Sequence, residues 1–392
     1  MNDMTTEKQN KRPNVPPLRF PEFSEPWERK KVSDILDFYS TNSLSWDQLE
    51  FANGDLRNLH YGMIHVGLPT LVDLAKDELP NIKQGNVPRN YELCVDGDVA
   101  FADASEDTND VAKAIELINT NGQQVVFGLH TIHGRDNKGL TAKGFKGYAF
   151  ASKIFHDQIK RIAQGTKIFS ISSKNFAECY IGLPTLQEQR KIAHLLSIID
   201  HRITVQNKII ERLQSLMDGI AQRLTAHLPN IRIADCLECH SSTLQENQLN
   251  EKGKYSVYGA NGVCGYTDFP AINGDSILIV KDGSGVGNVS FVTGKYSVLG
   301  TSNYLTAKSG YNLRYLYYCL MIFKFAPYKT GMAIPHIYFK DYGKAKIYCP
   351  TLEEQERIAK LLSKIELKIV IERYITNHYI QHKQYLLHQM FI

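Results

Sequence analysis

The stretch PTLQEQRKIAHLL at residues 184–196 decides the fold, because the chain repeats it as PTLEEQERIAKLL at residues 350–362. Extended to 17 positions, the two copies are identical at eleven of them. The agreement continues upstream at the same offset of 166 residues, in the pairs Gly165/Gly331, Ile168/Ile334, Ile171/Ile337, Lys174/Lys340 and Ile181/Ile347. Self-similarity of this extent predicts that one chain contains two related halves.

A second and weaker match supports the same division. WERKKVSDILDFYS at 27–40 resembles PNIRIADCLECHSS at 229–242. The chain is therefore expected to alternate globular units with helices. The predicted order is a polar, disordered arm over 1–17, a globular unit over 18–183, a helix over 184–228, a second globular unit over 229–349 and a helix over 350–392. The first unit is the longer one, and its extra residues are expected in loops.

Each copy of the repeated motif opens a helix. Thr185 and Glu188 have the spacing of a capping box, which the second copy preserves. Apolar residues then follow at alternating steps of four and three, a heptad seam formed by Ile192, Leu196, Ile199, Ile203, Ile210, Leu213, Met217, Ile220 and Leu224. Gln206 is the only polar member of this seam, and Glu372 occupies the equivalent place in the second helix. The two stripes are expected to pack together as a coiled coil, with Gln206 and Glu372 setting the register.

The composition is that of a folded protein with two or three domains and no membrane span. The 392 residues are 43% apolar and 22% charged, with a net charge of +4. Seven scattered cysteines and a polar start that does not resemble a secretory signal predict reduced thiols and a cytoplasmic location. A mildly basic chain is compatible with a nucleic-acid partner but does not identify one.

Both globular units are rich in short β segments separated by Gly and Asn turns, for example VDGDVAFAD at 95–103 and YSVYGANGVCGYTDF at 255–269. Helical pieces are expected over 105–120 and 312–325. The predicted fold class is α+β, with two β-rich mixed α/β units rather than doubly wound domains.

Two motifs that suggest a cofactor have simpler explanations. CLECH at 236–240 has the pattern of a haem attachment site, but the matching residues in the first unit are Ile35, Phe38 and Tyr39. The cysteines are therefore expected to be small buried hydrophobic residues. KDGSGVGN at 281–288 lacks the third glycine of a dinucleotide-binding turn, which favours a turn between strands or a loop that approaches a phosphate.

With these features the chain resembles the specificity (S) subunit of type I restriction–modification systems. The resemblance rests on LRFPEFSEPWERKKVSDI at 18–35, on the paired P-T-L-x-E-Q-x-x-I-A-x-L-L motifs and on the long helix that each motif opens. It implies two target recognition domains, over 18–183 and 229–349, that each read one half of a split DNA sequence. It also implies that the two helices pack antiparallel as a spacer and that a pseudo-twofold axis relates the domains.

The resemblance also implies the partners. Two methyltransferase (M) subunits would dock on the conserved motifs and helices and bind S-adenosylmethionine, and two restriction (R) subunits would use ATP and Mg²⁺. The chain itself would then carry no catalytic residue, cofactor or metal. The seam of the second helix weakens after Ile369, so its C-terminal half is expected to rest on a partner subunit.

Family resemblance does not identify base-reading residues, because recognition domains differ with their targets. Basic and amide side chains in turn-rich segments with interleaved aromatic residues are the physical candidates, since they can contact phosphates and base edges. The candidates are Lys83, Arg89, His130, Arg135, Lys138, Lys143, Lys146 and Lys167 in the first unit and Asn261, Lys281, Ser284, Asn288, Asn303, Lys329, Thr330, His336 and Lys340 in the second.

Two other functions remain open from the sequence. A self-sufficient DNA methyltransferase would need a catalytic Asn/Asp-Pro-Pro-aromatic motif, which VPPL at 15–18 does not supply, and a cofactor fold. A coiled-coil scaffold for protein partners is compatible with the composition and would bind no specific DNA sequence. The resemblance favours the non-catalytic specificity subunit over both.

Overall fold

The computed structural model describes residues 14–392 except 53, 109, 226 and 332–333. It divides into two compact units, of which unit 1 comprises residues up to 205 together with 375–392 and unit 2 comprises residues 206–374. The domain boundaries predicted from the sequence, at 184, 229 and 350, instead separate the long helices from the globular parts. The two divisions differ because each compact unit includes a part of both long helices.

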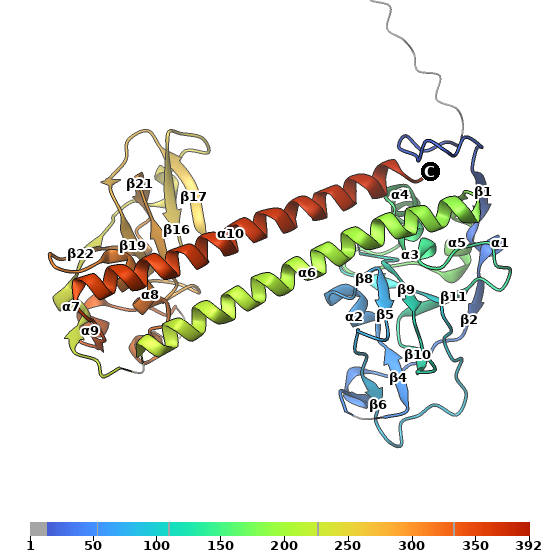
Figure 1. Ribbon diagram of the computed structural model, residues 1–392, viewed down its shortest axis with the longest axis horizontal. Coiled ribbons are helices and arrows are strands. Elements are labelled where there is room, and N and C mark those ends of the chain that lie inside the picture. Colours follow the sequence, from blue (N-terminus) through green and yellow to red (C-terminus); the bar gives the residue numbers. More distant parts are fainter. Residues whose placement is uncertain (1–13, 53, 109, 226, 332–333) are drawn as a thin grey trace, which may run out of the picture. The chain divides into compact units, whose positions relative to one another are not determined.

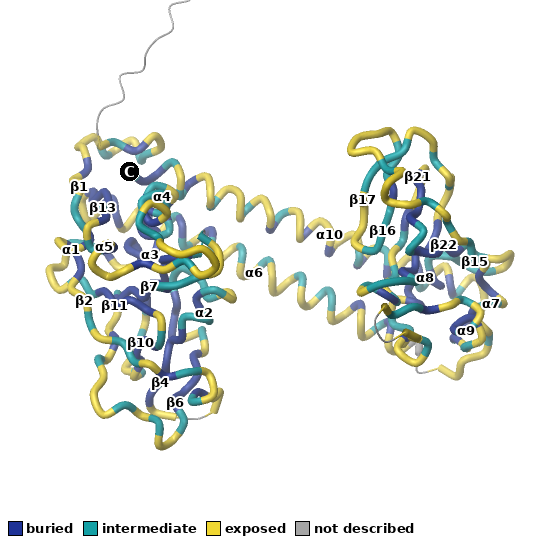
Figure 2. The backbone as a smooth tube through the Cα atoms, turned by 180° about the vertical axis from the view of Figure 1, so that it is seen from behind, coloured by how far each residue is buried: buried dark blue, intermediate teal, exposed yellow. Residues whose placement is uncertain are grey.

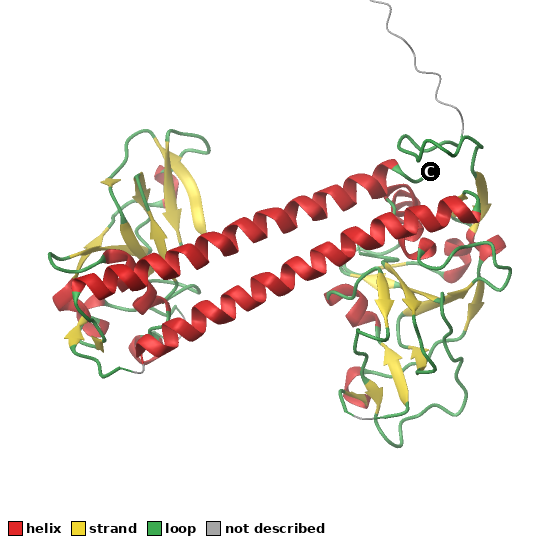
Figure 3. Ribbon diagram, in the orientation of Figure 1, coloured by secondary structure: helices red, strands yellow, loops and turns green. Residues whose placement is uncertain are grey.

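The long helices are α6 (Leu186–Thr225) and α10 (Leu352–Gln389). Figure 3 shows each as a single uninterrupted helix. Within unit 1, Asp200 lies 2.6 Å from the Lys383 ammonium, and Arg202 donates to the Tyr379 hydroxyl over 3.4 Å. As the residue number rises along α6, the number of the contacting residue in α10 falls, so the two helices run antiparallel there. In unit 2, Gln206 donates to Glu372, and this contact forms the expected polar layer.

Unit 1 combines two sheets with short helices (Figure 1). The five-stranded sheet has the order β2-β11-β7-β9-β5, the four-stranded sheet β10-β4-β6-β3, and two pairs are β1-β13 and β12-β8. The strands are β1 (Glu28–Lys31), β2 (Asp37–Tyr39), β3 (Leu49–Glu50), β4 (Leu56–Leu59), β5 (Leu71–Asp73), β6 (Asn81–Ile82), β7 (Val99–Ala102), β8 (Ala104–Ser105), β9 (Ala114–Ile118), β10 (Gln124–Phe127), β11 (Thr131–Arg135), β12 (Phe169–Ser170) and β13 (Tyr180–Leu183). The helices are α1 (Val32–Ile35), the 3-10 helix η1 (Trp46–Gln48), α2 (Tyr61–Val66), α3 (Phe145–Phe150), α4 (Lys153–Ile162) and α5 (Ser173–Ala177).

Unit 2 repeats part of this topology. Its sheets have the orders β15-β22-β19-β20 and β17-β16-β21-β18, and β14 pairs with β23. The strands are β14 (Ile231–Arg232), β15 (Leu237–Ser241), β16 (Tyr255–Gly259), β17 (Gly262–Thr267), β18 (Ile272–Asn273), β19 (Ser276–Val280), β20 (Val289–Val292), β21 (Lys295–Val298), β22 (Ser302–Ala307) and β23 (Lys346–Ile347). The helices are α7 (Ile233–Cys236), η2 (Glu246–Gln248), α8 (Leu313–Met321), η3 (Ala326–Tyr328) and α9 (Phe339–Tyr342). The antiparallel trio β15-β22-β19 matches β2-β11-β7 of unit 1.

The repeated motif performs the same structural task in both units. Gln189 and Gln355 are each 1% exposed. The side-chain amide of each donates over 2.9 Å to the carbonyl of the proline that opens its motif. The side-chain carbonyl oxygen of each accepts a backbone N–H from its globular part. Gln189 accepts from Ala142 over 2.7 Å, and Gln355 accepts from Asn312 over 2.9 Å. The conserved glutamine therefore attaches each long helix to its own globular part.

The buried cores include the helix seams. In unit 1, Leu196 of α6 lies in one cluster with Leu386 of α10 and with Met390, which follows that helix. The Trp27 ring packs edge-on against Phe391 at 6.3 Å. The seam residues of the C-terminal half of α10 therefore pack within this chain, and contact of this half with a partner subunit stays a prediction. In unit 2 the cluster joins Met217, Leu362 and Ile369 to α8 and its sheet. The outer faces of both helices stay exposed (Figure 2).

Three local expectations differ from the structure. The helix expected over 105–120 is wrong, because Ala114–Ile118 is strand β9, which is buried and paired with both β7 and β5. The extra residues of the first unit lie mainly between β4 and β7, where they form α2 and β5 rather than loops alone. Residues 1–13 of the predicted arm lie outside the described residues, but Asn14 accepts the Trp27 N–H over 2.8 Å and is therefore ordered.

The predicted helix over 312–325 is confirmed as α8, although α8 ends at Met321. Cys236 is fully buried in the core, as its match to Ile35 suggested, and burial raises the pKa of its thiol to about 12. Among the described residues, no helix is both long and apolar enough to cross a bilayer.

Candidate nucleic-acid interface

In unit 2, two loops that are distant in sequence meet at the end of β19. The glycine-rich loop 281–288 connects β19 to β20, as the sequence predicted for a turn between strands. The second loop, 329–338, packs against it. The Ile337 N–H donates to the Lys281 carbonyl over 2.9 Å, and the Gly283 N–H donates to the Pro335 carbonyl over 3.0 Å. The turn between β16 and β17 is the third member, because the Ala260 side chain lies 3.6 Å from where a Cβ on Gly285 would be.

These three segments bring together most candidates of the second unit. Their side chains are exposed or half-buried, and the group consists of Asn261, Lys281, Ser284, Asn288, Lys329, Thr330 and His336, together with Lys340 of the adjoining helix α9. The His336 ring lies 3.5 Å from the Asp282 carboxylate, and the Lys340 ammonium lies 5.3 Å from the centre of the Tyr338 ring. The surface offers cationic, amide and hydroxyl groups, which can contact both phosphates and base edges.

Part of this surface recurs in unit 1 at the repeat offset of 166. The Gln164 and Ser170 backbones exchange two hydrogen bonds, of 2.9 and 2.8 Å. Thr330 and His336 do the same over 2.9 and 2.8 Å. We call the segments 164–170 and 330–336 the finger loops, of which the second is described except at residues 332–333. The Ile171 N–H then donates to the Asp103 carbonyl over 3.0 Å, as Ile337 does to Lys281. The repeat therefore identifies which end of unit 1 corresponds to the loop surface of unit 2.

His130 and Lys167 lie at this end of unit 1. Lys167 is exposed on the finger loop. His130 adopts a left-handed backbone with φ of 56°, and its ring lies 3.2 Å from the Asp103 carboxylate. A cavity of about 430 Å³ lies at this end, lined by Tyr61, His65, Ala104, Ser105, Glu106, Asp107, Asp110, His130 and Ile168. Its acidic lining distinguishes this end of unit 1 from the loop surface of unit 2.

Arg135, Lys138 and Lys143 lie away from the finger loop. His130 precedes β11 and Arg135 ends it, and five strand residues span about 17 Å. Lys138 donates to the Asp34 carbonyl over 2.8 Å, and the Lys143 ammonium lies 2.6 Å from Asp96. The basic groups at this end of the sheet are therefore already engaged within the chain.

Arg135 belongs to a buried ionic network. Its guanidinium donates to both Asp98 oxygens, over 2.9 and 2.8 Å, and to Glu92 over 2.8 Å. His133 also lies 2.8 Å from the Asp98 carboxylate. Burial opposes ionisation of Asp98, but the hydrogen bonds from His133 and Arg135 outweigh it and hold its pKa below the ordinary value. Arg135 therefore has a structural role.

Cys94, Asp98 and His133 could in principle hold a metal ion, because their ligand atoms lie within 4.8 Å of one another. All three side chains are buried. The Asp98 oxygens, however, already accept the hydrogen bonds of His133 and Arg135, and burial raises the pKa of the Cys94 thiol well above its usual value. A protonated thiol and an engaged carboxylate fit an internal ionic network better than a metal centre.

Two candidates do not reach the surface. Lys146 is 3% exposed, with its ammonium 3.3 Å from Glu116 and 3.0 Å from the Thr141 hydroxyl. Asn303 is 6% exposed and accepts the Ser241 hydroxyl over 3.0 Å. The expectation that they contact DNA is not supported, because α3 buries Lys146 against β9 and β22 lies between two neighbouring strands.

The remaining two candidates follow β6 in unit 1. The Lys83 ammonium donates to the Asp47 carbonyl over 2.5 Å. Arg89 is exposed in the segment that leads from β6 to β7. The parallel pair β4-β10 of the sheet that contains β6 recurs as β16-β21 in unit 2, but neither Lys83 nor Arg89 lies on a strand of that pair or on a finger loop. Their contact with DNA stays a prediction.

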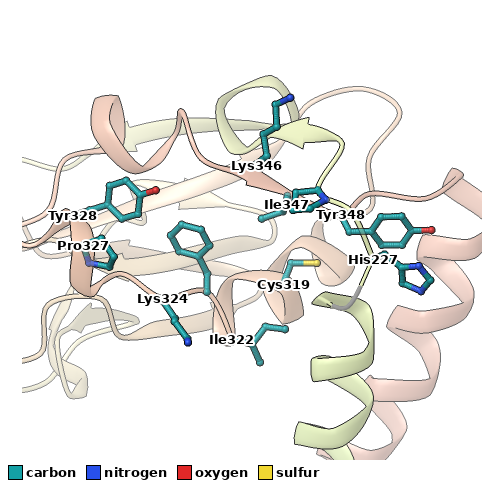
Figure 4. A pocket seen from close by; sticks show the side chains of 11 residues that line it. His227, Cys319, Ile322, Lys324, Pro327, Tyr328, Lys346, Ile347 and Tyr348 are labelled. Carbon is teal, nitrogen blue, oxygen red and sulfur yellow. The ribbon is translucent and has the colours of Figure 1, made fainter.

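A separate cavity of about 340 Å³ lies where α6 enters the globular part of unit 2. Figure 4 shows it, with the His227 and Tyr348 rings stacked at one end, 4.4 Å between centres. Apolar side chains such as Ile322 and Phe323 line much of it. It contains none of the candidates and lies outside the loop surface.

The residues that sequence reasoning missed are the isoleucines of the finger loops. Ile168 and Ile334 are 61% and 60% exposed. The alignment of the two halves already paired them, but an apolar residue in a repeat is usually interpreted as core. Only the structure shows that both side chains face solvent.

The comparisons with known proteins agree with this architecture. A family model described as the type I restriction modification DNA specificity domain matches residues 125–215 and again residues 230–378, together more than half of the chain. The two matches fall on the two repeats, and each includes one finger loop.

Individual relatives are distant. A putative type I specificity subunit of Mycoplasma pneumoniae is 28% identical over 164 residues, which cover 37% of this chain and 44% of that protein. A putative type I restriction enzyme MjaX specificity subunit of Methanocaldococcus jannaschii is 25% identical over 390 residues, covering 90% of this chain and 89% of that protein. The chain thus spans less than half of the first relative's length and most of the second's.

Among solved structures, the S subunit of a type I restriction–modification system from M. genitalium superimposes with a TM-score of 0.65 at 16% identity, covering 96% of this chain and 99% of that one. At this identity the likeness concerns the fold alone. The repeated family match carries the assignment, and the chain belongs to the type I restriction–modification DNA specificity family.

Proposed function

We propose that the chain is the DNA specificity subunit of a type I restriction–modification complex, in which each globular part reads one half of a split DNA sequence. The observation that carries the proposal is the finger loop, which both units present with the same backbone hydrogen bonds although their sequences differ. One chain with an internal repeat can imitate a dimer on the nearly twofold-symmetric DNA duplex while reading two different half-sites.

In this proposal the loop surface of unit 2 supplies most of the polar contacts of one half-site. Lys329 and Lys340 would neutralise phosphates, while Asn288 would donate to and accept from a base edge. Unit 1 would use fewer cations near its finger loop. Its acidic residues, such as Glu106, would then suit the amino group of cytosine rather than phosphates.

We further propose that the long helices dock methyltransferase subunits. Leu367, Val370 and Ile371 of α10 have helical spacing on one face and are 60%, 56% and 43% exposed. Apolar side chains exposed together on one helix face are typical of an interaction surface. S-adenosylmethionine, ATP and Mg²⁺ are assigned to partner subunits, and the chain is assigned no catalytic role. The complex is expected to act in the cytoplasm.

The test is methylation mapping by single-molecule sequencing in a host that expresses the chain with its methyltransferase subunit. A split, adenine-methylated motif is expected, and it is expected to vanish when this chain is deleted. If no methylated motif depends on the chain, the proposal fails and the scaffold function becomes the better account. Binding of S-adenosylmethionine by the chain alone would instead favour a self-sufficient methyltransferase.

A further inference from the structure

Both finger loops expose an aliphatic side chain at the same position. Ile168 and Ile334 are separated by the repeat offset, and their exposed fractions, 61% and 60%, are nearly equal. Among the sequences of the two loops, QGTKIFS and TGMAIPH, the glycine and the isoleucine are the shared residues. The two units have thus diverged around one exposed apolar group.

The backbone of each loop is built to hold this tight turn. Gly165 has a φ of 136°, and a Cβ there would lie 1.8 Å from the Ile168 carbonyl oxygen. Gly331 has a φ of 88°, and a Cβ there would lie 2.3 Å from the Ile334 carbonyl oxygen. Only glycine fits both positions, because of the positive φ and the close backbone approach. The shared glycine therefore fixes the position of the shared isoleucine.

Polar side chains lie beside both isoleucines among the described residues. Ile168 adjoins Lys167 and shares a cavity lining with Glu106 and Asp107. Ile334 lies in a loop that carries Lys329 and His336. A protein-binding surface usually has an apolar centre of several residues. An exposed aliphatic group beside cationic and acidic side chains instead resembles a DNA-reading surface, where apolar contacts recognise the C5-methyl group of thymine.

We propose that Ile168 and Ile334 determine specificity, each contacting a thymine methyl group in the half-site that its own unit reads. This inference rests on the proposed function and adds to it the residue and the base feature. The polar residues beside each isoleucine would contact neighbouring base edges and phosphates.

The experiment uses the complex of this chain with its methyltransferase subunit, on DNA that carries the motif found by methylation mapping. Ile168→Ala and Ile334→Ala are compared with Val66→Ala and Phe269→Ala, which remove side chains that are 89% and 84% exposed in the same two units. Each thymine of the motif is then replaced in turn by deoxyuridine, which lacks only the methyl group. Ile168→Val and Ile334→Val are included as conservative variants, and gel filtration verifies that each variant assembles.

Each isoleucine variant is expected to lose about tenfold in methylation rate, from the apolar contact removed, while the controls and the valine variants stay close to the parent. In the parent complex, one deoxyuridine per half-site is expected to cause a similar loss. That deoxyuridine is expected to cause no further loss in the alanine variant of the matching unit.

Two results would overturn the inference while leaving the proposed function intact. One is a dependent motif that the alanine variants methylate as fast as the controls do. The other is a loss that no deoxyuridine substitution masks, which would indicate a wedge between bases instead of a methyl contact. Absence of any dependent motif would overturn the proposed function itself.

Discussion

Replacing Glu188 by alanine is expected to lower the free energy of unfolding of unit 1 by about 3 kcal/mol. The Glu188 side chain is fully buried and binds the Arg19 guanidinium through both oxygens, over 2.7 and 2.8 Å. It also accepts the Trp27 indole N–H over 3.2 Å. Its loss leaves a charged group and an indole donor without a partner. The low end of the range for broken buried pairs applies because Arg19 is 10% exposed and reaches some water.

The repeat supplies a matched control for this prediction. Glu354 occupies the same motif position at the start of α10, but it pairs with Arg357, only three residues away, and its side chain is 42% exposed. Both glutamates sit in the first turn of a helix, so any helix-dipole effect is common to the two variants. Glu354→Ala is expected to cost no more than about 0.5 kcal/mol.

Tryptophan fluorescence during urea unfolding measures the effect, because Trp27 and Trp46 are the only tryptophans of the chain and both lie in unit 1. Far-UV circular dichroism monitors the chain as a whole and therefore also covers Glu354→Ala. Equal losses for the two variants would show that the motif glutamate acts only at the helix start and that the Arg19 contact adds no stability.

Replacing Lys146 by alanine is expected to destabilise unit 1 by about 3–5 kcal/mol. Glu116 is fully buried and accepts the N–H groups of Gly144 and Gly147, each over 2.8 Å, at the start of α3. Lys146 supplies the nearby positive charge. Burial raises the pKa of Glu116 even with this partner present. Without the ammonium, the carboxylate would be a buried charge with no counter-ion.

The pH dependence identifies the mechanism. A carboxyl group whose pKa is higher in the folded than in the unfolded state binds a proton more readily when folded. The deficit of Lys146→Ala is therefore expected to shrink as pH falls from neutral toward the unfolded pKa of about 4.3. Lys143→Ala is the control, since Lys143 is exposed and its pair with Asp96 is worth at most about 1 kcal/mol. A deficit of the same size at all pH values would contradict the role assigned to Glu116.

The sequence predicted the features that depend on local order. The heptad positions define the buried seams, Gln206 meets Glu372, and Thr185 accepts the Glu188 N–H as an N-cap over 3.4 Å. Spacing alone could not predict what the Glu188 carboxylate binds, because its partner Arg19 lies 169 positions away in the sequence. Spacing identifies helix ends, whereas long-range partners decide what each side chain does.

The candidate site was predictable only in part, because the sequence does not show which face of a segment is covered. Lys143 and Lys146 are three residues apart in a basic, glycine-rich segment, yet Lys143 is exposed whereas Lys146 lies on the buried side of α3. The residue class that was searched, basic and amide side chains, also omitted Ile168 and Ile334. Their exposure follows from the way each finger loop closes on itself and is attached to a segment that is distant in sequence.

The most direct test of the central claim, that each unit reads its own half-site, is a domain exchange. Residues 18–183 are replaced by the equivalent segment of a family member with a different known target, and adenine methylation is mapped with the same methyltransferase subunit. The account predicts that one half of the split motif changes while the other half and the gap between them stay the same. A change in both halves, or an unchanged motif, would contradict it.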